Sequence, residues 1–454
     1  MTQTEALDIL KLGHNVFLTG PAGSGKTYLL NQFIGFLKKQ GIPVGVTAST
    51  GIAATHMGGT TIHSFTGLGI KDSLTPKDLT DLLKKQYLRK HFFKTKVLII
   101  DEISMLHSNQ LDMVDQICKA FKKNQAPFGG MQVIMCGDFF QLPPIERKKL
   151  AETSSTQEVF AFKNSDSPFA YNASIWQDMQ LEICYLDEQY RQSDRAFLTV
   201  LNDIRNGEVT DSTVEYLSER LKKEPEGYTR PTRLFTHNTD VDTMNSKHLQ
   251  ELVGEAKEFI MYSRGSLGIV EGLRRSCLAP EKLVLKKGAQ VMFVKNNYEE
   301  GYVNGTLGEV IDFSKDGQPL VRTFDGSEIT VGQVSWEVKE DDVELAAISQ
   351  IPLRLAWAIT VHKSQGMSLD AAEIDLSRSF VPGQGYVALS RLRSLQGLKL
   401  IGMNQMALTV NPEVSEMDRK FREKSDEAIL NMQSLGLDKK QKLQEEYLTY
   451  LKHR

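Results

Sequence analysis

One short segment of the chain carries the residue types that bind a nucleoside triphosphate. GPAGSGKT, residues 20–27, matches the pattern G-x-x-x-x-G-K-[ST] and follows the apolar run VFLTG. Its glycines let main-chain amides close around phosphates, Lys26 would reach the β and γ oxygens, and Thr27 would offer a hydroxyl to Mg²⁺. Between a strand and a helix, the pattern predicts an ATP site. The residues expected to form that site are Gly23, Ser24, Gly25, Lys26, Thr27 and Tyr28.

Acidic and amide side chains follow the next buried runs. Asp101, after KVLII, would hold the Mg²⁺ ion, and Glu102 would polarise the attacking water. The alternative is an acidic pair that is favoured only by a helix dipole. Gln141, after QVIMCGD, carries an amide that would hydrogen-bond the γ-phosphate or the water. Together these residues predict hydrolysis of ATP.

Phosphoryl transfer also needs cations that neutralise the charge developing on the γ oxygens, and the planar fork of arginine suits that role. Two candidates stand outside the first domain: Arg191 in DEQYRQSD and Arg391 in GYVALSR. An arginine chosen blindly is usually a surface residue. Their order in the chain relative to the other motifs is what favours the catalytic interpretation.

Composition narrows the class of protein. The 454 residues carry 54 Lys and Arg against 57 Asp and Glu, a net charge of −3, so a polyanion would bind only in a local groove. The four cysteines have no zinc-ligand spacing and indicate a reducing compartment. No apolar run reaches the roughly 18 residues of a membrane span, and the N-terminus is acidic where a signal peptide is basic.

The elements that must position these residues follow an α/β pattern. Short apolar runs alternate with stretches of helical period, which predicts two parallel-sheet domains, while QVMFV, TLGEVIDF, PLVRTF and EITV predict a small inserted β-barrel. The charged tail after 411 is predicted helical, with a capping box at Asp438 and Gln441 and with Leu443, Tyr447 and Leu451 spaced by four. The expected divisions are a first domain at 1–185 with an insertion at about 51–90, a second at 186–280 and 351–405, the barrel at 281–350 and a helical extension at 406–454.

The whole series of motifs resembles one enzyme family. GPAGSGKT, TASTGIAATHMGGTTIHSF, DEISM, GDFFQLPP, QYRQ, ITVHKSQG and GYVALSR, in this order over about residues 1–405, are similar to the Pif family of superfamily-1 DNA helicases. The stretch from LDMVDQICKAF to PFGG is similar to that family's own signature, which favours it over RecD-type relatives. The resemblance implies two RecA-like motor domains.

The resemblance also implies roles and substrates. Gln3 would read the adenine edge, Arg191 and Arg391 would complete the site from the second domain, and Gln365 and Gly366 would line it. The family implies 5′→3′ movement on single-stranded DNA and unwinding of duplex junctions, forks, G-quadruplexes and RNA-DNA hybrids. Because the chain begins almost at Gln3, it resembles compact bacterial or phage members. We therefore expect a monomer in the bacterial cytosol or a phage-infected cell.

A motor on a single strand needs backbone contacts that tolerate any base sequence, and flat groups that stack on bases. The candidates lie at predicted strand ends, where open α/β sheets bind ligands, and in the barrel. A buried histidine or a solvated lysine face is the alternative for several of them. The candidates are Thr47, Thr50, His63, Ser64, Phe65, Thr236, His237, Asn238, Lys295, Asn296, Thr360, His362, Lys363 and Ser364.

Other functions share part of this pattern. A metabolite kinase or a signalling switch would keep the phosphate loop, but it would not need the second arginine-bearing domain. A remodeller that strips DNA without unwinding it, or a RecD-like recombination helicase, would use the same motor. Stimulation of the ATPase by single-stranded DNA separates the first group from the others.

Overall fold

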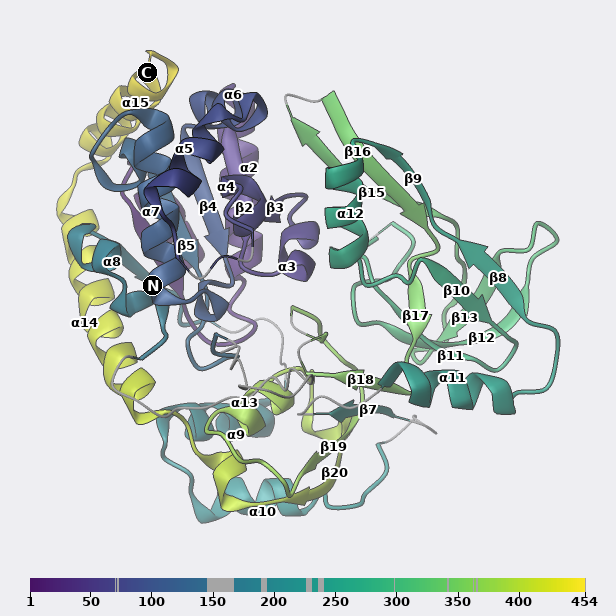
Figure 1. The fold of residues 1–454 in the computed structure, drawn as a ribbon. Coiled ribbons are helices and arrows are strands. Elements are labelled where there is room, and N and C mark those ends of the chain that lie inside the picture. The colour runs from purple at the N-terminus through teal and green to yellow at the C-terminus, as the bar shows by residue number, and fades with distance from the viewer. Residues whose placement is uncertain are drawn as a thin grey trace, which may run out of the picture. The chain divides into compact units, whose positions relative to one another are not determined.

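The computed structural model describes residues 1–69, 71, 73–144, 167–188, 194–225, 231–235, 241–297, 299–340, 343–361, 363–364 and 366–453. They divide into two compact units (Figure 1). The first unit comprises Met1–Tyr190 together with Glu416–Arg454, and the second comprises Arg191–Ser415. The chain therefore passes from the first unit to the second and returns.

The first unit is built on one parallel sheet in the order β3-β2-β4-β5-β1-β6. Every residue of β1, β4 and β5 is buried, as expected for strands covered on both faces. The predicted runs VFLT, VGVTA, VLIID and QVIMC all form strands, so this part of the expected fold is confirmed. The strands are β1 (Val16–Thr19), β2 (Val44–Ala48), β3 (Thr60–Thr61), β4 (Val97–Asp101), β5 (Gln132–Cys136) and β6 (Glu182–Tyr185).

Helices connect these strands. α1 begins with a capping box in which the Thr2 hydroxyl accepts from the Glu5 amide and the Glu5 carboxylate accepts from the Thr2 amide. The helices are α1 (Gln3–Lys11), α2 (Lys26–Lys39), α3 (Gly51–His56), α4 (Ile62–Thr66), α5 (Pro76–Lys84), α6 (Gln86–Lys94), α7 (Ser108–Lys122) and α8 (Ser174–Asp178), with short 3-10 helices at Ile103–Met105, Pro127–Gly130 and Ala170–Asn172.

The tail forms two helices, α14 (Pro412–Ser434) and α15 (Leu437–His453), which run along one side of the first unit (Figure 1). Their buried residues Ala428, Met432 and Leu451 join the core formed by α1, α2 and the sheet. The predicted helical tail is confirmed. The predicted position of the helix cap is wrong, because α15 already begins at Leu437 and Asp438 lies inside its first turn.

The second unit contains a parallel sheet in the order β18-β7-β19-β20. The expected α/β class is thus confirmed in both units. The strands are β7 (Thr232–Phe235), β18 (Ala358–Thr360), β19 (Ala372–Leu376) and β20 (Leu398–Met403). The helices of this unit are α9 (Arg195–Asn206), α10 (Asp211–Ser218), α11 (Val241–Glu251), α12 (Leu267–Ser276) and α13 (Gln384–Leu389), with short 3-10 helices at Leu395–Gly397 and Gln405–Leu408.

An antiparallel section lies between β7 and β18 in the chain. Its sheets have the orders β14-β13-β12-β11-β17, β15-β16-β9 and β10-β8, and Gly317 and Gly326 take positive φ in the connections between β12 and β13 and between β13 and β14. Since β8 and β9 pair with β10 and β16, the section begins earlier than the expected residue 281. The strands are β8 (Lys257–Ile260), β9 (Tyr262–Gly265), β10 (Lys282–Leu285), β11 (Gln290–Phe293), β12 (Leu307–Phe313), β13 (Pro319–Thr323), β14 (Glu328–Thr330), β15 (Val334–Glu340), β16 (Val343–Gln350) and β17 (Leu353–Leu355).

Candidate functional site

The phosphate loop joins the end of β1 to the start of α2. Gly20, Gly23 and Gly25 all have positive φ, a conformation that side chains disfavour. At Gly20 a Cβ would also lie 2.4 Å from the carbonyl oxygen of Leu186. Glycine is therefore required at this bend, which brings main-chain amides toward the N-terminus of α2.

Lys26 is the first residue of α2, and its ammonium points back into the loop. Its Nζ donates to the carbonyl oxygens of Gly20, at 2.8 Å, and Pro21, at 2.9 Å. Thr27 and Tyr28 are exposed on the same turn. The loop thus presents one cation and one exposed hydroxyl at the helix N-terminus, the arrangement that binds phosphate.

Gln3 lies at the start of α1 and contacts this loop. Its Nε2 donates to the carbonyl oxygen of Ser24 over 3.3 Å, while the Ser24 side chain is buried. The first helix of the chain is therefore tied to the middle of the phosphate loop. This places an amide side chain beside the loop, as the predicted adenine contact requires.

The acidic pair lies at the carboxyl end of β4. Because β1, β4 and β5 are parallel, this end belongs to the same edge of the sheet as the phosphate loop. Asp101 is buried, and burial raises the pKa of its carboxyl, while hydrogen bonds from the Cys136 thiol and the Glu102 amide and the charge of Lys26 act in the opposite direction. A buried carboxylate in the field of the phosphate-loop lysine fits a cation-binding role.

Glu102 adopts a strained backbone. Its φ of 53° and ψ of 44° are left-handed, which is uncommon for a residue with a side chain. The conformation is held by the Ser49 hydroxyl, which donates to the Glu102 carbonyl at 2.6 Å, and by the Ser49 amide, which donates to the Asp101 carbonyl at 3.0 Å. The end of β2 thus fixes the turn that carries the predicted water-activating residue.

Gln141 follows β5 along the same edge. Its Nε2 lies 3.4 Å from Oδ2 of the buried Asp138, and its main-chain amide donates to the Asp138 carbonyl over 2.9 Å. The structure therefore brings Gln3, the loop, Lys26, Asp101, Glu102 and Gln141 to one edge of one sheet.

Two residues of this site, Ser49 and Cys136, were not predicted from the sequence. Only the register of the strands reveals Cys136, because Ile100 pairs with Met135 and the next residues are Asp101 and Cys136. Ser49 directly follows β2, whose Ala48 pairs with Asp101.

The predicted residues of the second unit are only partly described. Arg391 is buried, its Nε donates to the Val387 carbonyl at 3.1 Å and its Nη2 lies 3.3 Å from the Ser390 hydroxyl. Gly366 has a φ of 74°. Arg191 and Gln365 lie outside the described residues.

The structure corrects part of the predicted DNA track. Thr47 is buried and its hydroxyl donates to the Ile99 carbonyl at 2.6 Å, and the buried Ser364 hydroxyl donates to the Val361 carbonyl at 2.8 Å. Phe65 is also buried, with its ring 4.3 Å from that of His91 and 5.2 Å from that of Phe92. These three side chains serve the core, so the prediction that they contact a DNA strand is wrong.

Other track residues remain accessible in the first unit. Ser64 is exposed on α4 and His63 beside it is half-buried. Thr50 caps α3 by accepting from the Ala53 amide. These residues follow β2 and β3, so they lie at the edge of the sheet that also carries the phosphate loop.

In the second unit, the clearest accessible cation of the track is Lys363. Its ammonium lies 3.2 Å from a carboxylate oxygen of Asp242, while the Thr360 hydroxyl accepts from its main-chain amide. Lys295 instead packs over the Trp336 ring at 5.2 Å and donates to the Ser335 carbonyl, and burial lowers the pKa of its ammonium. The exposed Asn296 accepts a hydrogen bond at its Oδ1 from the Asn304 main-chain amide, at 2.7 Å. Thr236, His237, Asn238 and His362 lie outside the described residues.

Membrane spans and clustered metal ligands are both missing from the part of the chain that the structure describes. None of its helices is both long and apolar enough to cross a membrane. Within the same residues, no group of three or more His, Cys, Asp or Glu side chains is arranged to hold a metal ion.

Comparisons with known proteins agree with this geometry. The model of the PIF1-like helicase family matches residues 3–215, and that of the 2B domain of DNA helicase Pif1 matches residues 269–313. ATP-dependent DNA helicase Pif1 of Psychrobacter sp. is 43% identical over 488 residues, which cover 94% of this chain and 72% of that protein.

Solved structures show the same similarity. Bacteroides sp Pif1 in complex with ADP-AlF4 has a TM-score of 0.77 at 33% identity and covers 93% of this chain and 96% of that chain. Bacteroides Pif1 bound to ssDNA has a TM-score of 0.60 at 32% identity and covers 94% of this chain and 97% of that chain. Sequence and fold thus agree over nearly the whole chain, and the chain belongs to the Pif1 family of helicases.

Proposed function

We propose that this ATP-dependent DNA helicase of the Pif1 family moves 5′→3′ along single-stranded DNA and unwinds the duplex ahead of it. The observation that carries the proposal is the gathering of Lys26, Asp101, Glu102 and Gln141 at one edge of one parallel sheet, in a chain similar to Pif1 helicases over most of its length. The direction rests on the resemblance of the TIHSF segment and of the inserted β section to the 5′→3′ group.

The nucleotide site supplies the parts that phosphoryl transfer needs. Lys26 neutralises the β and γ phosphates, and the main-chain amides of residues 23–27 surround them. Mg²⁺ binds few protein ligands and keeps several waters, so the exposed hydroxyl of Thr27 and the carboxylate of Asp101 fit this ion without a cluster of acids. When bound, the ion would neutralise charge on the phosphates. Glu102 would take the proton from the attacking water.

Gln141 would report the state of the nucleotide. Its Nε2 lies 3.4 Å from Oδ2 of the buried Asp138, which follows β5 at the same edge of the sheet as Asp101. Arg191 and Arg391 would complete the site from the second unit, with Gln365 and Gly366. Hydrolysis would then alternate the affinity of the two units for the strand.

The strand would be held mainly by backbone contacts. In the first unit these come from Thr50, His63 and Ser64, and in the second from Lys363, because the buried Thr360 hydroxyl already accepts from the Lys363 main-chain amide. Thr236, His237, Asn238, His362 and Asn296 complete the proposed track. Because these groups contact phosphate rather than base edges, binding would tolerate any base sequence. The similarity to Bacteroides Pif1, which was solved bound to ssDNA, supports this partner.

The expected substrates are DNA structures that contain a junction between single and double strands. A single-strand motor of this type separates duplex junctions and forks, and the family resemblance extends this to G-quadruplexes and RNA-DNA hybrids. One chain contains both units with their candidate residues, so we propose that a monomer is active.

Strand displacement tests the direction. Three duplexes of identical sequence are compared, with a 5′ tail, a 3′ tail or blunt ends, in ATP and Mg²⁺. We expect unwinding of the 5′-tailed duplex alone, with Lys26→Ala as the inactive control. Unwinding of the 3′-tailed duplex alone would overturn the direction. Removal of a bound protein block without strand separation would identify a remodeller.

A further inference from the structure

The C-terminal helices α14 and α15 are not needed to form the motifs of the nucleotide site, yet they contact the elements that surround it. Three sets of contacts join them to the edge strand β6, to the N-terminal end of α1 and to its C-terminal end. All of the residues in these contacts belong to the first unit.

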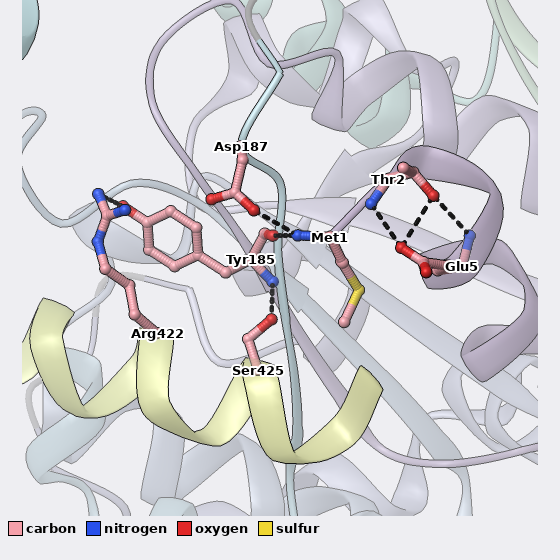
Figure 2. Close-up of polar contacts among 7 residues, drawn as sticks. All are labelled: Met1, Thr2, Glu5, Tyr185, Asp187, Arg422 and Ser425. Atoms are coloured by element: carbon pink, nitrogen blue, oxygen red, sulfur yellow. Dashed lines mark hydrogen bonds and ion pairs between the residues drawn. The ribbon is translucent and has the colours of Figure 1, made fainter. Parts of the chain in front are cut away.

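The first set holds Tyr185, the last residue of β6. Ser425 Oγ accepts from the Tyr185 amide at 3.1 Å (Figure 2), and the Tyr185 hydroxyl lies 3.0 Å from the Asp418 carboxylate. Arg422 donates to the same hydroxyl at 2.6 Å and stacks its guanidinium 4.2 Å from the ring centre. Since β6 is an edge strand, α14 provides a partner for the Tyr185 amide, which has no neighbouring strand on that side.

The second set leads from Tyr185 to the start of α1. The Met1 nitrogen donates to the Tyr185 carbonyl at 2.7 Å and lies 2.5 Å from an oxygen of Asp187, as Figure 2 shows. Glu5 caps the start of α1 through Thr2, and the side chain of Gln433 in α14 is one of the groups that lower the pKa of its carboxyl. The hydrogen bond from the Thr2 amide is the largest of several causes that lower the pKa of Glu5. The start of α1 is thus held from two sides.

The third set holds the other end of α1. The Tyr447 hydroxyl of α15 donates to Gln132 Oε1 at 2.6 Å, and Gln132 Nε2 donates to the carbonyls of Leu10, at 2.9 Å, and His14, at 2.8 Å. The Tyr447 ring packs so closely on Gly13 that a Cβ there would lie 2.4 Å from it. Tyr447 therefore orients the amide that binds one carbonyl in the last turn of α1 and one in the segment that follows it.

Gln3, the first residue of α1, donates to the Ser24 carbonyl of the phosphate loop. We propose that α14 and α15 act as a positioning element of the nucleotide site, holding α1 so that Gln3 selects adenine over guanine. The inference rests on the proposed reading of adenine by Gln3. Tyr447, Arg422 and Ser425 are positioning residues in this scheme, because they act through α1 and touch no nucleotide.

Two conservative variants of the full chain test the element. Tyr447→Phe removes only the hydroxyl that orients Gln132, and Arg422→Gln removes the cation above Tyr185. Their matched controls are Tyr87→Phe on the exposed face of α6 and Arg419→Gln on the exposed face of α14. DNA-stimulated hydrolysis of ATP and of GTP is measured separately.

We expect Tyr447→Phe and Arg422→Gln each to raise KM for ATP about fivefold, the effect of one hydrogen bond of about 1 kcal/mol. The kcat for ATP and both constants for GTP should stay within twofold, so the ATP-to-GTP ratio of kcat/KM falls about fivefold. The two controls should keep the wild-type ratio. A lower melting temperature with an unchanged ratio would overturn the inference, because it would show a purely structural role.

Gln3→Ala separates this inference from the proposed function. If Gln3→Ala leaves the ATP-to-GTP ratio unchanged, the adenine contact itself is wrong. If it lowers the ratio, the double variant Gln3→Ala with Tyr447→Phe decides the role of the tail. A ratio equal to that of Gln3→Ala alone supports positioning through Gln3. Additive losses would place the effect of Tyr447 elsewhere and overturn the inference.

Discussion

At the scale of single residues, Glu102 combines backbone strain with a position beside the phosphate loop. A left-handed glutamate persists only where its surroundings hold it, here through the hydrogen bonds from Ser49. Glu102→Gln keeps the shape and hydrogen bonds of the turn but removes the base. We expect unchanged nucleotide and DNA affinity and turnover lower by at least about 10²-fold. DNA-stimulated ATPase measures the effect, and turnover within a few-fold of wild type would leave Glu102 a structural role.

Arg391 offers a second residue test, because a buried arginine serves either the core of its own unit or the transferred phosphate. Arg391→Ala should slow hydrolysis about 10³-fold, the lower end for an arginine that stabilises the transition state. Arg391→Lys keeps the charge, loses the fork and should also be slow. The matched control Arg393→Lys changes an arginine paired with Asp370 at 2.6 Å. Single-turnover hydrolysis is the measurement, and a normal rate in Arg391→Lys would refute a contact with phosphate.

The predicted nucleotide residues of the first unit lie together at one sheet edge, whereas several of the predicted DNA residues are buried, and this difference has a physical reason. The phosphate loop depends on local glycine geometry, and Asp101 and Glu102 depend on the end of one strand, so neighbouring residues determine both. Thr47, Phe65 and Ser364 also follow or end strands, but which way their side chains turn depends on partners far along the chain. Thr47 donates to the carbonyl of Ile99, 52 residues away, and no local pattern indicates that choice.

At the scale of elements, β1, β4 and β5 of the first sheet were predictable because their apolar runs are continuous and every residue in them is buried. β8 and β9 were not, since their residues are mostly exposed or half-buried and alternate too weakly to mark a strand. The helices of the tail were predicted from spacing alone. Their packing on α1 was not predicted, because the contacts of Tyr447 with Gly13 and Gln132 join residues more than 300 positions apart.

The placement of α4 gives a prediction at this scale. Gly45 in β2 lies beneath Phe65, and a Cβ there would come within 2.7 Å of that ring. Gly45→Ala should therefore displace α4 and destabilise the unit by about 1–3 kcal/mol. Gly35→Ala on α2, where a Cβ meets nothing within 4 Å, should stabilise it by about 0.5–1 kcal/mol.

The melting temperatures of Gly45→Ala and Gly35→Ala measure these two effects on stability. Since α4 carries His63 and Ser64, affinity for single-stranded DNA should fall in Gly45→Ala while nucleotide affinity is kept. Equal melting temperatures of both variants would contradict the packing of Phe65 on β2.

At the scale of the whole molecule, the positive and negative charges nearly cancel, but they are unevenly distributed along the chain. The segment 82–96 holds six Lys or Arg and no acid, yet the full chain has a net charge of −3. Lys363, the accessible cation of the proposed track, is itself paired with Asp242, and Lys295 is turned toward Trp336. A DNA strand would therefore meet few uncompensated cations along its path.

This balance predicts a weak dependence of DNA binding on salt. Each phosphate neutralised on a single strand contributes about −0.7 to the slope of log K against log salt concentration. With fewer than about six such contacts, the slope for a homopolymer strand should be shallower than about −4.

Lys363→Ala should make the slope less negative by about 0.7 and weaken mixed and homopolymer strands equally, because the contact is with phosphate. Fluorescence anisotropy at several salt concentrations measures both quantities. Lys222→Ala, on the exposed surface of the same unit, is the control. A loss in Lys363→Ala confined to one base composition would instead make Lys363 a base-reading residue.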